Sequence, residues 1–263
     1  MKEKYTLLLI ITTFLLVSLI LFKSSKPLVK KEFTYNFSFP FFKEEKKEEY
    51  LSYKEKNNLS LKDAIIHVNI GLNNPFYTNV EPSKDINKIT MLVNKYHCVD
   101  KNYTPINLIK VNNLLINKEA YDSFLNMKKD INKEGLDIRI ISAYRSFEYQ
   151  ESLYNKYLKT DDKKIVDTYS ARPGYSEHHT GLAIDIDNVK LDFNKFYLTK
   201  EFLWMNENAH NYGFILRYPK NKEYITGYSY EPWHYRYVGR EIATYIKKHN
   251  STYEEYYYEF LDL

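Results

Sequence analysis

The chain has 263 residues, 44% of them hydrophobic and 27% charged, a balance typical of a folded globular protein with one large or two small domains. Its formal net charge of +4 is spread along the sequence, which argues against the clustered basic surface of a nucleic-acid-binding protein, so we expect no nucleic-acid partner. Cys98 is the only cysteine, which excludes an intrachain disulfide.

The first 23 residues predict a membrane anchor. Lys2 and Lys4 precede an uncharged, largely apolar run over residues 5–22, and Lys23 ends it. A helix over this run rises about 27 Å, just enough to cross the hydrocarbon core of a bilayer. Because the run lacks the small-x-small cleavage site of a secretory signal, we expect an uncleaved signal anchor with the large domain outside the cytoplasm.

Residues 24–57 are predicted to be a tether. Pro27 and Pro40 interrupt this segment, and residues 43–56 form a mixed Lys/Glu run that fits either a solvated helix or plain linker. The folded domain is therefore expected to occupy residues 58–263.

This folded region predicts helices mixed with short strands. Ser60 is a suitable N-cap for a first short helix. Apolar residues recur at helical spacing over residues 117–134, and Gly135 follows as a stop. Further helices are predicted over residues 147–158, 199–212, 240–249 and 253–261, and strands over residues 136–141, 183–186, 214–216 and 233–238. Because βαβ regularity is missing, the pattern indicates an α+β fold.

Two short clusters contain residue types that bind zinc. The first, Ser-Glu-His-His-Thr-Gly-Leu-Ala-Ile-Asp, includes His178 and Asp185, and the second, Glu-Pro-Trp-His, includes Glu231 and His234. Two histidines and one carboxylate form a zinc site whose fourth position is open to water. The remaining carboxylate can take a proton from that water. This combination predicts metal-assisted hydrolysis.

Local geometry can bring the first cluster around one ion. Asp185 lies in a predicted strand, and His178 precedes it in a turn where Gly181 permits a sharp bend. Spacing alone leaves two choices open, because adjacent or alternate residues reach the same region. The ligands can be His178 or His179, and Asp185 or Asp187.

The pattern resembles that of the VanY-type D-alanyl-D-alanine carboxypeptidases, zinc peptidases of a wider group that includes lysostaphin-like endopeptidases and hedgehog proteins. The similarity rests on Ser-x-His-x-x-Gly-x-Ala-x-Asp at residues 176–185, Ser-Ala-Tyr-Arg-Ser-Phe-Glu-Tyr-Gln at residues 142–150, and Glu-Pro-Trp-His-Tyr-Arg-Tyr-Val-Gly at residues 231–239. It extends over about residues 59–260. The resemblance implies a small antiparallel sheet flanked by helices.

The resemblance also implies a role for each site residue. Zinc would be held by three ligands: His178, Asp185 and His234. Glu231 would act as general base toward the attacking water and later as acid toward the leaving amine. Arg145, with its planar and always charged guanidinium, would stabilise negative charge on the scissile carbonyl oxygen. Three further residues would position the substrate or line its pocket: Ser176, Gln150 and Trp233.

These expectations combine into a single-pass membrane protein, monomeric, whose zinc carboxypeptidase domain faces the cell wall and removes the terminal D-Ala from peptidoglycan stem peptides. Two alternatives keep the zinc site but change the bond that is cut: an L,D-carboxypeptidase and a peptidoglycan endopeptidase. A third alternative is a non-catalytic, zinc-stabilised module that binds the cell wall. Glu231 together with Arg145 argues against this third reading.

Overall fold

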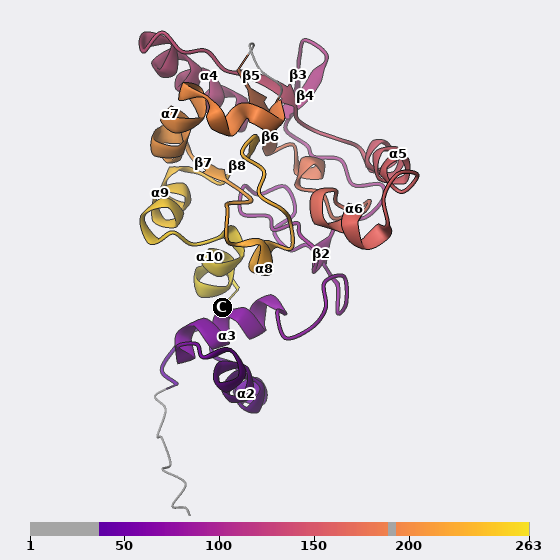
Figure 1. Cartoon of the computed structure of the whole chain (residues 1–263), viewed down its shortest axis with the longest axis vertical. Helices are drawn as coiled ribbons and strands as arrows, with labels where there is room; N and C mark the ends of the chain where they lie inside the picture. Colours follow the sequence, from indigo (N-terminus) through magenta and orange to yellow (C-terminus); the bar gives the residue numbers. More distant parts are fainter. Residues whose placement is uncertain (1–36, 189–192, 263) are drawn as a thin grey trace, which may run out of the picture. The chain divides into compact units, whose positions relative to one another are not determined.

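A four-stranded antiparallel sheet joins the two sequence clusters. The structure of the chain, a computed structural model, describes residues 37–188 and 193–262. The strands of the sheet follow the order β5 (Arg139–Ser142), β6 (Ala183–Asp187), β8 (His234–Tyr237) and β7 (Phe214–Leu216) (Figure 1). Asp185 of β6 pairs with His234 of β8, so the register of these two strands places the second cluster beside the first.

One face of this sheet is apolar and packs against α4 (Lys118–Lys133) and α7 (Lys200–Asn208). The helix predicted over residues 117–134 is confirmed as α4, and its buried residues are the ones that recur at helical spacing: Ala120, Phe124, Met127 and Ile131. They share a core with Ile184 of β6 and Tyr235 of β8. Because side chains alternate along a strand, Asp185 and His234 project from the opposite face.

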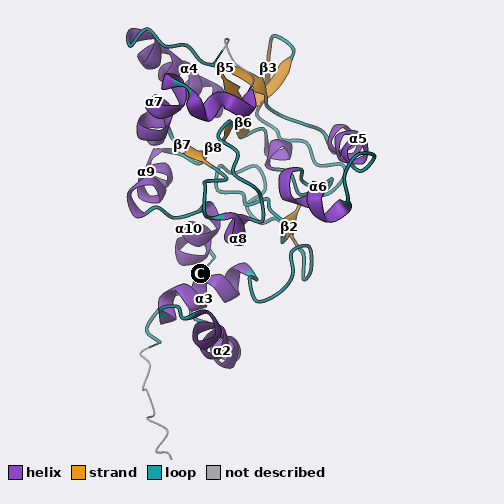
Figure 2. Ribbon diagram, viewed as in Figure 1, coloured by secondary structure: helices purple, strands orange, loops and turns teal. Residues whose placement is uncertain are grey.

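A second core forms around α3 (Leu61–Ile70), α9 (Arg240–His249) and α10 (Tyr253–Phe260). Ser60 caps α3 as predicted, since its side chain accepts from the backbone N–H of Asp63. The helices predicted over residues 240–249 and 253–261 are confirmed as α9 and α10. Figure 2 shows α3 and α10 at the end of the fold away from α4, with α9 between α7 and α10.

Residues 39–57 differ from the predicted tether, because they belong to the compact unit that begins at Phe39. This segment contains a 3-10 turn, η1 (Glu44–Lys46), followed by helix α2 (Lys47–Asn57). Tyr50 of α2 is fully buried, and its hydroxyl donates to Oδ1 of Asn69 at 2.8 Å. The side-chain amide of Asn69 in turn donates to the carbonyl oxygen of Phe41 at 2.8 Å. The buried rings of Phe41 and Tyr50 and these hydrogen bonds therefore hold the segment on α3.

The remaining predicted elements are present with small differences at their ends. The helix over residues 147–158 is α5 (Phe147–Tyr157), and the helix over residues 199–212 divides into α7 and the 3-10 turn η4 (Ala209–Tyr212). The sequence pattern does not predict several short elements: β1 (Glu81–Pro82), β2 (His97–Cys98), β3 (Leu108–Val111), β4 (Leu114–Asn117), α6 (Lys163–Tyr169), η2 (Glu177–Thr180), η3 (Phe193–Leu198) and α8 (Glu223–Thr226). These segments have two to seven residues, so any period in them is weak.

The predicted anchor over residues 1–23 lies outside the described residues, as does the tether up to residue 36. Within residues 37–188 and 193–262, none of the helices combines the length and the apolar character needed to cross a membrane. The anchor therefore stays a prediction from sequence.

Candidate active site

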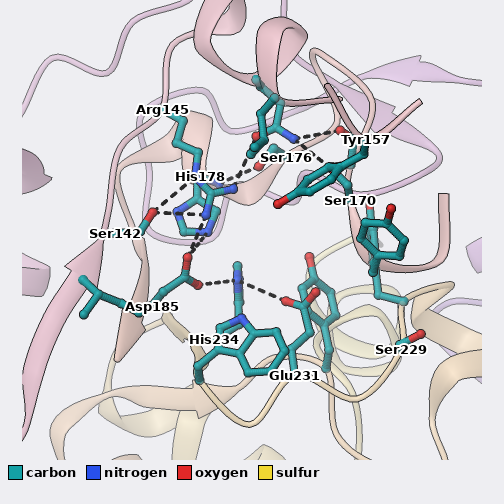
Figure 3. A pocket seen from close by; sticks show the side chains of 18 of the residues that line it. Ser142, Arg145, Tyr157, Ser170, Ser176, His178, Asp185, Ser229, Glu231 and His234 are labelled. Carbon is teal, nitrogen blue, oxygen red and sulfur yellow. Dashed lines mark hydrogen bonds and ion pairs between the residues drawn. The ribbon is translucent and has the colours of Figure 1, made fainter. Parts of the chain in front are cut away.

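A cleft of about 570 Å³ opens on the polar face of the sheet. Its walls include all eight site residues expected from the sequence: Arg145, Gln150, Ser176, His178, Asp185, Glu231, Trp233 and His234. Figure 3 shows His178, Asp185 and His234 converging at one end of this cleft, with Glu231 beside them. Residues up to 56 positions apart in the chain, from His178 to His234, thus meet in one place, because β6 and β8 are neighbours.

His178 lies in the η2 turn, and a backbone hydrogen bond determines which of its ring nitrogens can bind a metal. Its Nδ1 donates to the carbonyl oxygen of Ala143 at 2.6 Å. The lone pair of Nε2 then faces Oδ2 of Asp185 at 3.3 Å. Burial is the main cause that lowers the pKa of His178 to about 4, so the ring is neutral at physiological pH. Ser176 supports the turn, since its hydroxyl accepts from the backbone N–H of His178.

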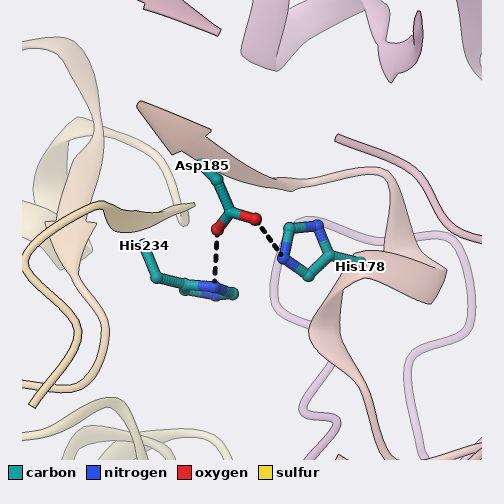
Figure 4. Close-up of side chains that lie close together, drawn as sticks. All are labelled: His178, Asp185 and His234. Atoms are coloured by element: carbon teal, nitrogen blue, oxygen red, sulfur yellow. Dashed lines mark ion pairs between the residues drawn. The ribbon is translucent and has the colours of Figure 1, made fainter. Parts of the chain in front are cut away.

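His234 approaches the same carboxylate from β8. Its Nδ1 lies 3.2 Å from Oδ1 of Asp185, so each oxygen of Asp185 faces one histidine (Figure 4). The two imidazole rings stand at 89° with centroids 4.9 Å apart. Burial opposes a charge on His234, but the nearby carboxylates of Asp185 and Glu177 raise its pKa to about 9. The site therefore attracts positive charge strongly.

This arrangement fits a zinc ion. The ligand atoms of His178, Asp185 and His234 all lie within 4.8 Å of one another. Zinc bonds of about 2.0–2.1 Å in a tetrahedron set neighbouring ligand atoms about 3.4 Å apart, close to the two distances above. Nε2 of His178 and Oδ1 of Asp185 are buried, and neither has a hydrogen-bond partner among the described residues. A nitrogen lone pair that faces a carboxylate is favourable only with a cation between them.

The geometry also favours His178 over His179 and Asp185 over Asp187. Both ring nitrogens of His179 are used by the backbone: Nδ1 donates to the carbonyl oxygen of Arg145 at 2.8 Å, and Nε2 accepts from the N–H of Gly174 at 3.1 Å. Asp187 is paired with the guanidinium of Arg139, with Nε and Oδ1 2.7 Å apart.

Arg145 approaches His178, Asp185 and His234, here called the metal-type cluster, from another wall of the cleft. One terminal nitrogen, Nη2, lies 2.7 Å from Oδ2 of Asp185, and the guanidinium also donates to the hydroxyl of Ser142. Its Nη1 donates to Oε1 of Gln150 at 3.3 Å, while Nε2 of Gln150 donates to the carbonyl oxygen of Ala171 at 2.8 Å. Gln150 therefore orients Arg145, a link that the sequence does not predict.

Glu231 lies next to the cluster without joining it. Its Oε2 is 3.7 Å from Nδ1 of His234. Burial is the main cause that raises the pKa of Glu231 to about 7, and the nearby charge of Asp185 adds to the effect. A carboxyl group with a pKa near neutrality can accept a proton and return it at the same pH.

Two residues near His234 are not singled out from the sequence. The ring of Tyr218 lies over the imidazole, with centroids 4.8 Å apart, and Glu177 lies on the far side with its Oε2 3.5 Å from Nε2 of His234. Tyr218 belongs to the stretch Gly-Phe-Ile-Leu-Arg-Tyr-Pro (residues 213–219), which also resembles the VanY-type enzymes. Glu177 carries no such signal, because a glutamate before a histidine in a turn is most often solvent-exposed.

A family model described as VanY, D-alanyl-D-alanine carboxypeptidase, matches residues 113–240, which contain all eight site residues. The YodJ protein of Bacillus subtilis (strain 168) is 38% identical over 191 residues, which cover 68% of this chain and 70% of that protein. The chain belongs to the VanY family.

Solved structures show the same fold as this VanY-family chain. The LdcB LD-carboxypeptidase has a TM-score of 0.65 and 37% identity, and the match covers 69% of this chain and 91% of LdcB. VanYB in complex with D-alanine-D-alanine has a TM-score of 0.56 and 32% identity, with coverage of 64% and 96%. A mutant of the D,D-pentapeptidase VanY from the VanB-type cassette was solved with Zn(II), with the same TM-score and identity. The predicted α+β fold with a small antiparallel sheet is confirmed.

Proposed function

We propose that this chain is a zinc-dependent D-alanyl-D-alanine carboxypeptidase that removes the terminal D-Ala from peptidoglycan stem peptides. The observation that carries the proposal is the separation of two roles within one cleft. Three residues form a compact metal-type cluster, and Glu231 lies beside it with a pKa raised to about 7, chiefly by burial. A purely structural zinc site gains nothing from a fourth, titratable carboxyl group at its edge.

The side chains of the site have distinct tasks in hydrolysis. His178, Asp185 and His234 would hold a zinc ion, which would supply a Lewis acid for the substrate carbonyl and the attacking water. Glu231 takes one proton from the attacking water and passes it to the leaving amine nitrogen. The guanidinium of Arg145 stabilises the negative charge that develops on the carbonyl oxygen, a contribution of about 3–4 kcal/mol for one such donor.

The family indicates that the bond between the two terminal D-alanines is cut. One other specificity, that of an L,D-carboxypeptidase, also has support. VanYB has been solved with D-alanine-D-alanine, and the matching family model bears the D-alanyl-D-alanine name. The LdcB LD-carboxypeptidase has the higher TM-score of the structures compared, which makes an L,D-carboxypeptidase the second candidate. Both candidates use the same metal cluster, since they differ only in the residues that hold the peptide.

Two defined muropeptides distinguish the candidates. The zinc-loaded full-length chain is incubated with a stem pentapeptide that ends in D-Ala-D-Ala and, separately, with the tetrapeptide, and the products are identified by mass. We expect the pentapeptide to lose one alanine and the tetrapeptide to stay intact. Loss of alanine from the tetrapeptide alone supports the L,D-carboxypeptidase. Failure to cleave any peptide, combined with retained wall binding, supports the non-catalytic module.

We further propose that the catalytic unit acts outside the cell as a monomer. The support for the location is the apolar run over residues 5–22, because a short amino-terminal anchor leaves the large domain outside the cytoplasm by default. The support for a monomer is that one chain supplies every site residue. Protease treatment of intact protoplasts tests the location: the catalytic unit should be degraded while cytoplasmic markers survive. Light scattering of the detergent-solubilised chain tests the monomer.

A further inference from the structure

Glu177, the residue before His178, is 1% exposed and makes contacts on both of its oxygens. Oε1 accepts from Nε of Arg217 at 2.7 Å and from Nη1 of Arg236 at 3.0 Å. Oε2 lies 3.5 Å from Nε2 of His234, and both of these atoms otherwise lack a hydrogen-bond partner among the described residues. Glu177 therefore faces the ring nitrogen of His234 that does not face Asp185.

Arg217 connects Glu177 to the C-terminal helix. Its two terminal nitrogens donate to both carboxylate oxygens of Glu254 in α10, at 2.8 and 2.5 Å. Arg236 donates its remaining N–H groups to backbone carbonyl oxygens. Burial favours the neutral form of Glu177, but the two arginines hold its pKa well below its usual range. Two buried carboxylates and two buried guanidinium groups thus form one balanced network behind the metal cluster.

A histidine that offers one ring nitrogen to a metal carries its proton on the other nitrogen. His178 satisfies this rule through the hydrogen bond from its Nδ1 to Ala143. In His234 the nitrogen that faces Asp185 is Nδ1, so the proton belongs on Nε2. Oε2 of Glu177 is the acceptor that faces it, although 3.5 Å is longer than a standard hydrogen bond of about 2.9 Å.

We propose that Glu177 is a positioning residue of the zinc site, which holds the proton on Nε2 of His234 so that Nδ1 presents its lone pair to the metal. Arg217 and Glu254 fix the Glu177 carboxylate in turn, which makes α10 part of the structure that orients a metal ligand. The inference rests on the zinc site of the proposed function and is independent of which peptide bond is cut.

Zinc affinity of a Glu177→Gln variant of the full-length chain tests this inference. Glutamine preserves the size of the side chain but removes the negative charge that Arg217 and Arg236 hold in place. We expect the affinity, measured by competition with a chromophoric chelator, to fall about 10–100-fold, as is typical when the partner of a metal-bound histidine is lost. Glu201→Gln is the matched control, because Glu201 is also buried (6% exposed) and accepts from Asn188, and neither residue lines the cleft. Its zinc affinity should stay within about twofold of the wild type.

Nitrogen NMR of histidine-labelled wild-type chain gives a second readout that needs no variant. In the zinc-loaded protein, His234 should bind the metal through Nδ1 and keep a slowly exchanging proton on Nε2. Metal on Nε2 of His234 contradicts the inference, and so does an unchanged zinc affinity in folded Glu177→Gln protein. If that variant does not fold, the wild-type spectrum decides. Zinc binding without release of alanine contradicts the proposed function but leaves this inference intact.

Discussion

Nε2 of His178 lies 3.3 Å from Oδ2 of Asp185, and the hydrogen bond from Nδ1 of the same ring to Ala143 leaves Nε2 without a proton. Two acceptors that face each other inside a protein are unfavourable unless a cation joins them. The fold nevertheless maintains this arrangement, with β6 supplying the carboxylate and the η2 turn supplying the ring. We interpret the pair as half of a preformed metal site.

Substitution of the two adjacent histidines should separate metal binding from stability. His178→Ala removes a ligand, so we expect zinc affinity to fall by more than the roughly 10–100-fold typical of losing a surrounding partner. His179→Ala removes two hydrogen bonds to the backbone and should lower the free energy of unfolding by about 1–3 kcal/mol while zinc binding persists. Zinc titration and urea unfolding of both variants give the answer. Zinc loss in His179→Ala alone would show that the ligand has been assigned to the wrong ring.

Arg145→Lys should lower turnover without removing the metal. Lysine keeps the charge but lacks the planar fork that joins Asp185, Ser142 and Gln150. We expect kcat to fall about 10²–10³-fold, the usual effect of losing one donor to an oxyanion, and zinc content to stay near one per chain. The control is Arg139→Lys, whose partner Asp187 lies outside the cleft lining. Equal losses in the two variants would assign Arg145 a structural role.

The pH dependence of turnover should follow the ionisation of the Glu231 carboxyl group. A general base must be deprotonated, and burial raises the pKa of Glu231 to about 7. We therefore expect kcat/KM to decrease about tenfold per pH unit below that pKa. A bound zinc ion stabilises the charged carboxylate, so it moves this acid limb to lower pH and never to higher pH. A pH–rate profile with the pentapeptide measures the limb. A flat profile from about pH 5 to pH 8 contradicts the assignment of Glu231 as base.

Tyr50→Phe should destabilise the whole folded unit. The variant removes the hydroxyl that donates to Asn69 and leaves a buried acceptor unpaired, which costs about 1–3 kcal/mol. Tyr224→Phe is the control, since the Tyr224 side chain is 58% exposed. Urea unfolding of the two variants compares their free energies. Equal stability would contradict the role of this hydrogen bond in holding α2 on α3.

Helices and strands could be predicted from the sequence where their own residues show an apolar period. Helix α4 shows four apolar side chains at helical spacing, and these same residues are buried. Helix α2 shows no such stripe, because its single buried residue, Tyr50, lies in a run of lysines and glutamates. Its position depends on hydrogen bonds between residues 19 and 28 positions apart, which no local pattern reveals.

The residues of the candidate site could be predicted from the sequence, but the hydrogen bonds that connect them could not. Residue types and spacing indicate two histidines and two carboxylates, yet adjacent histidines have almost the same spacing. The backbone carbonyl groups of Ala143 and Arg145 distinguish them, and these come from the segment after β5. Glu177 could not be identified from the sequence because its role depends on Arg217 and Arg236. These two residues lie far from it in the sequence and approach it only in the folded sheet.

The most direct test of the account is turnover by a Glu231→Gln variant whose zinc content has been measured. Glutamine preserves the shape of the side chain but cannot take a proton from water. We expect about one zinc ion per chain, as in the wild type, and release of alanine from the pentapeptide about 10²–10⁴-fold slower. Glu201→Gln should match the wild type in both respects. Loss of zinc from Glu231→Gln would make Glu231 a ligand, and undiminished turnover would exclude it as the base; either result contradicts the separation of metal and base on which the account depends.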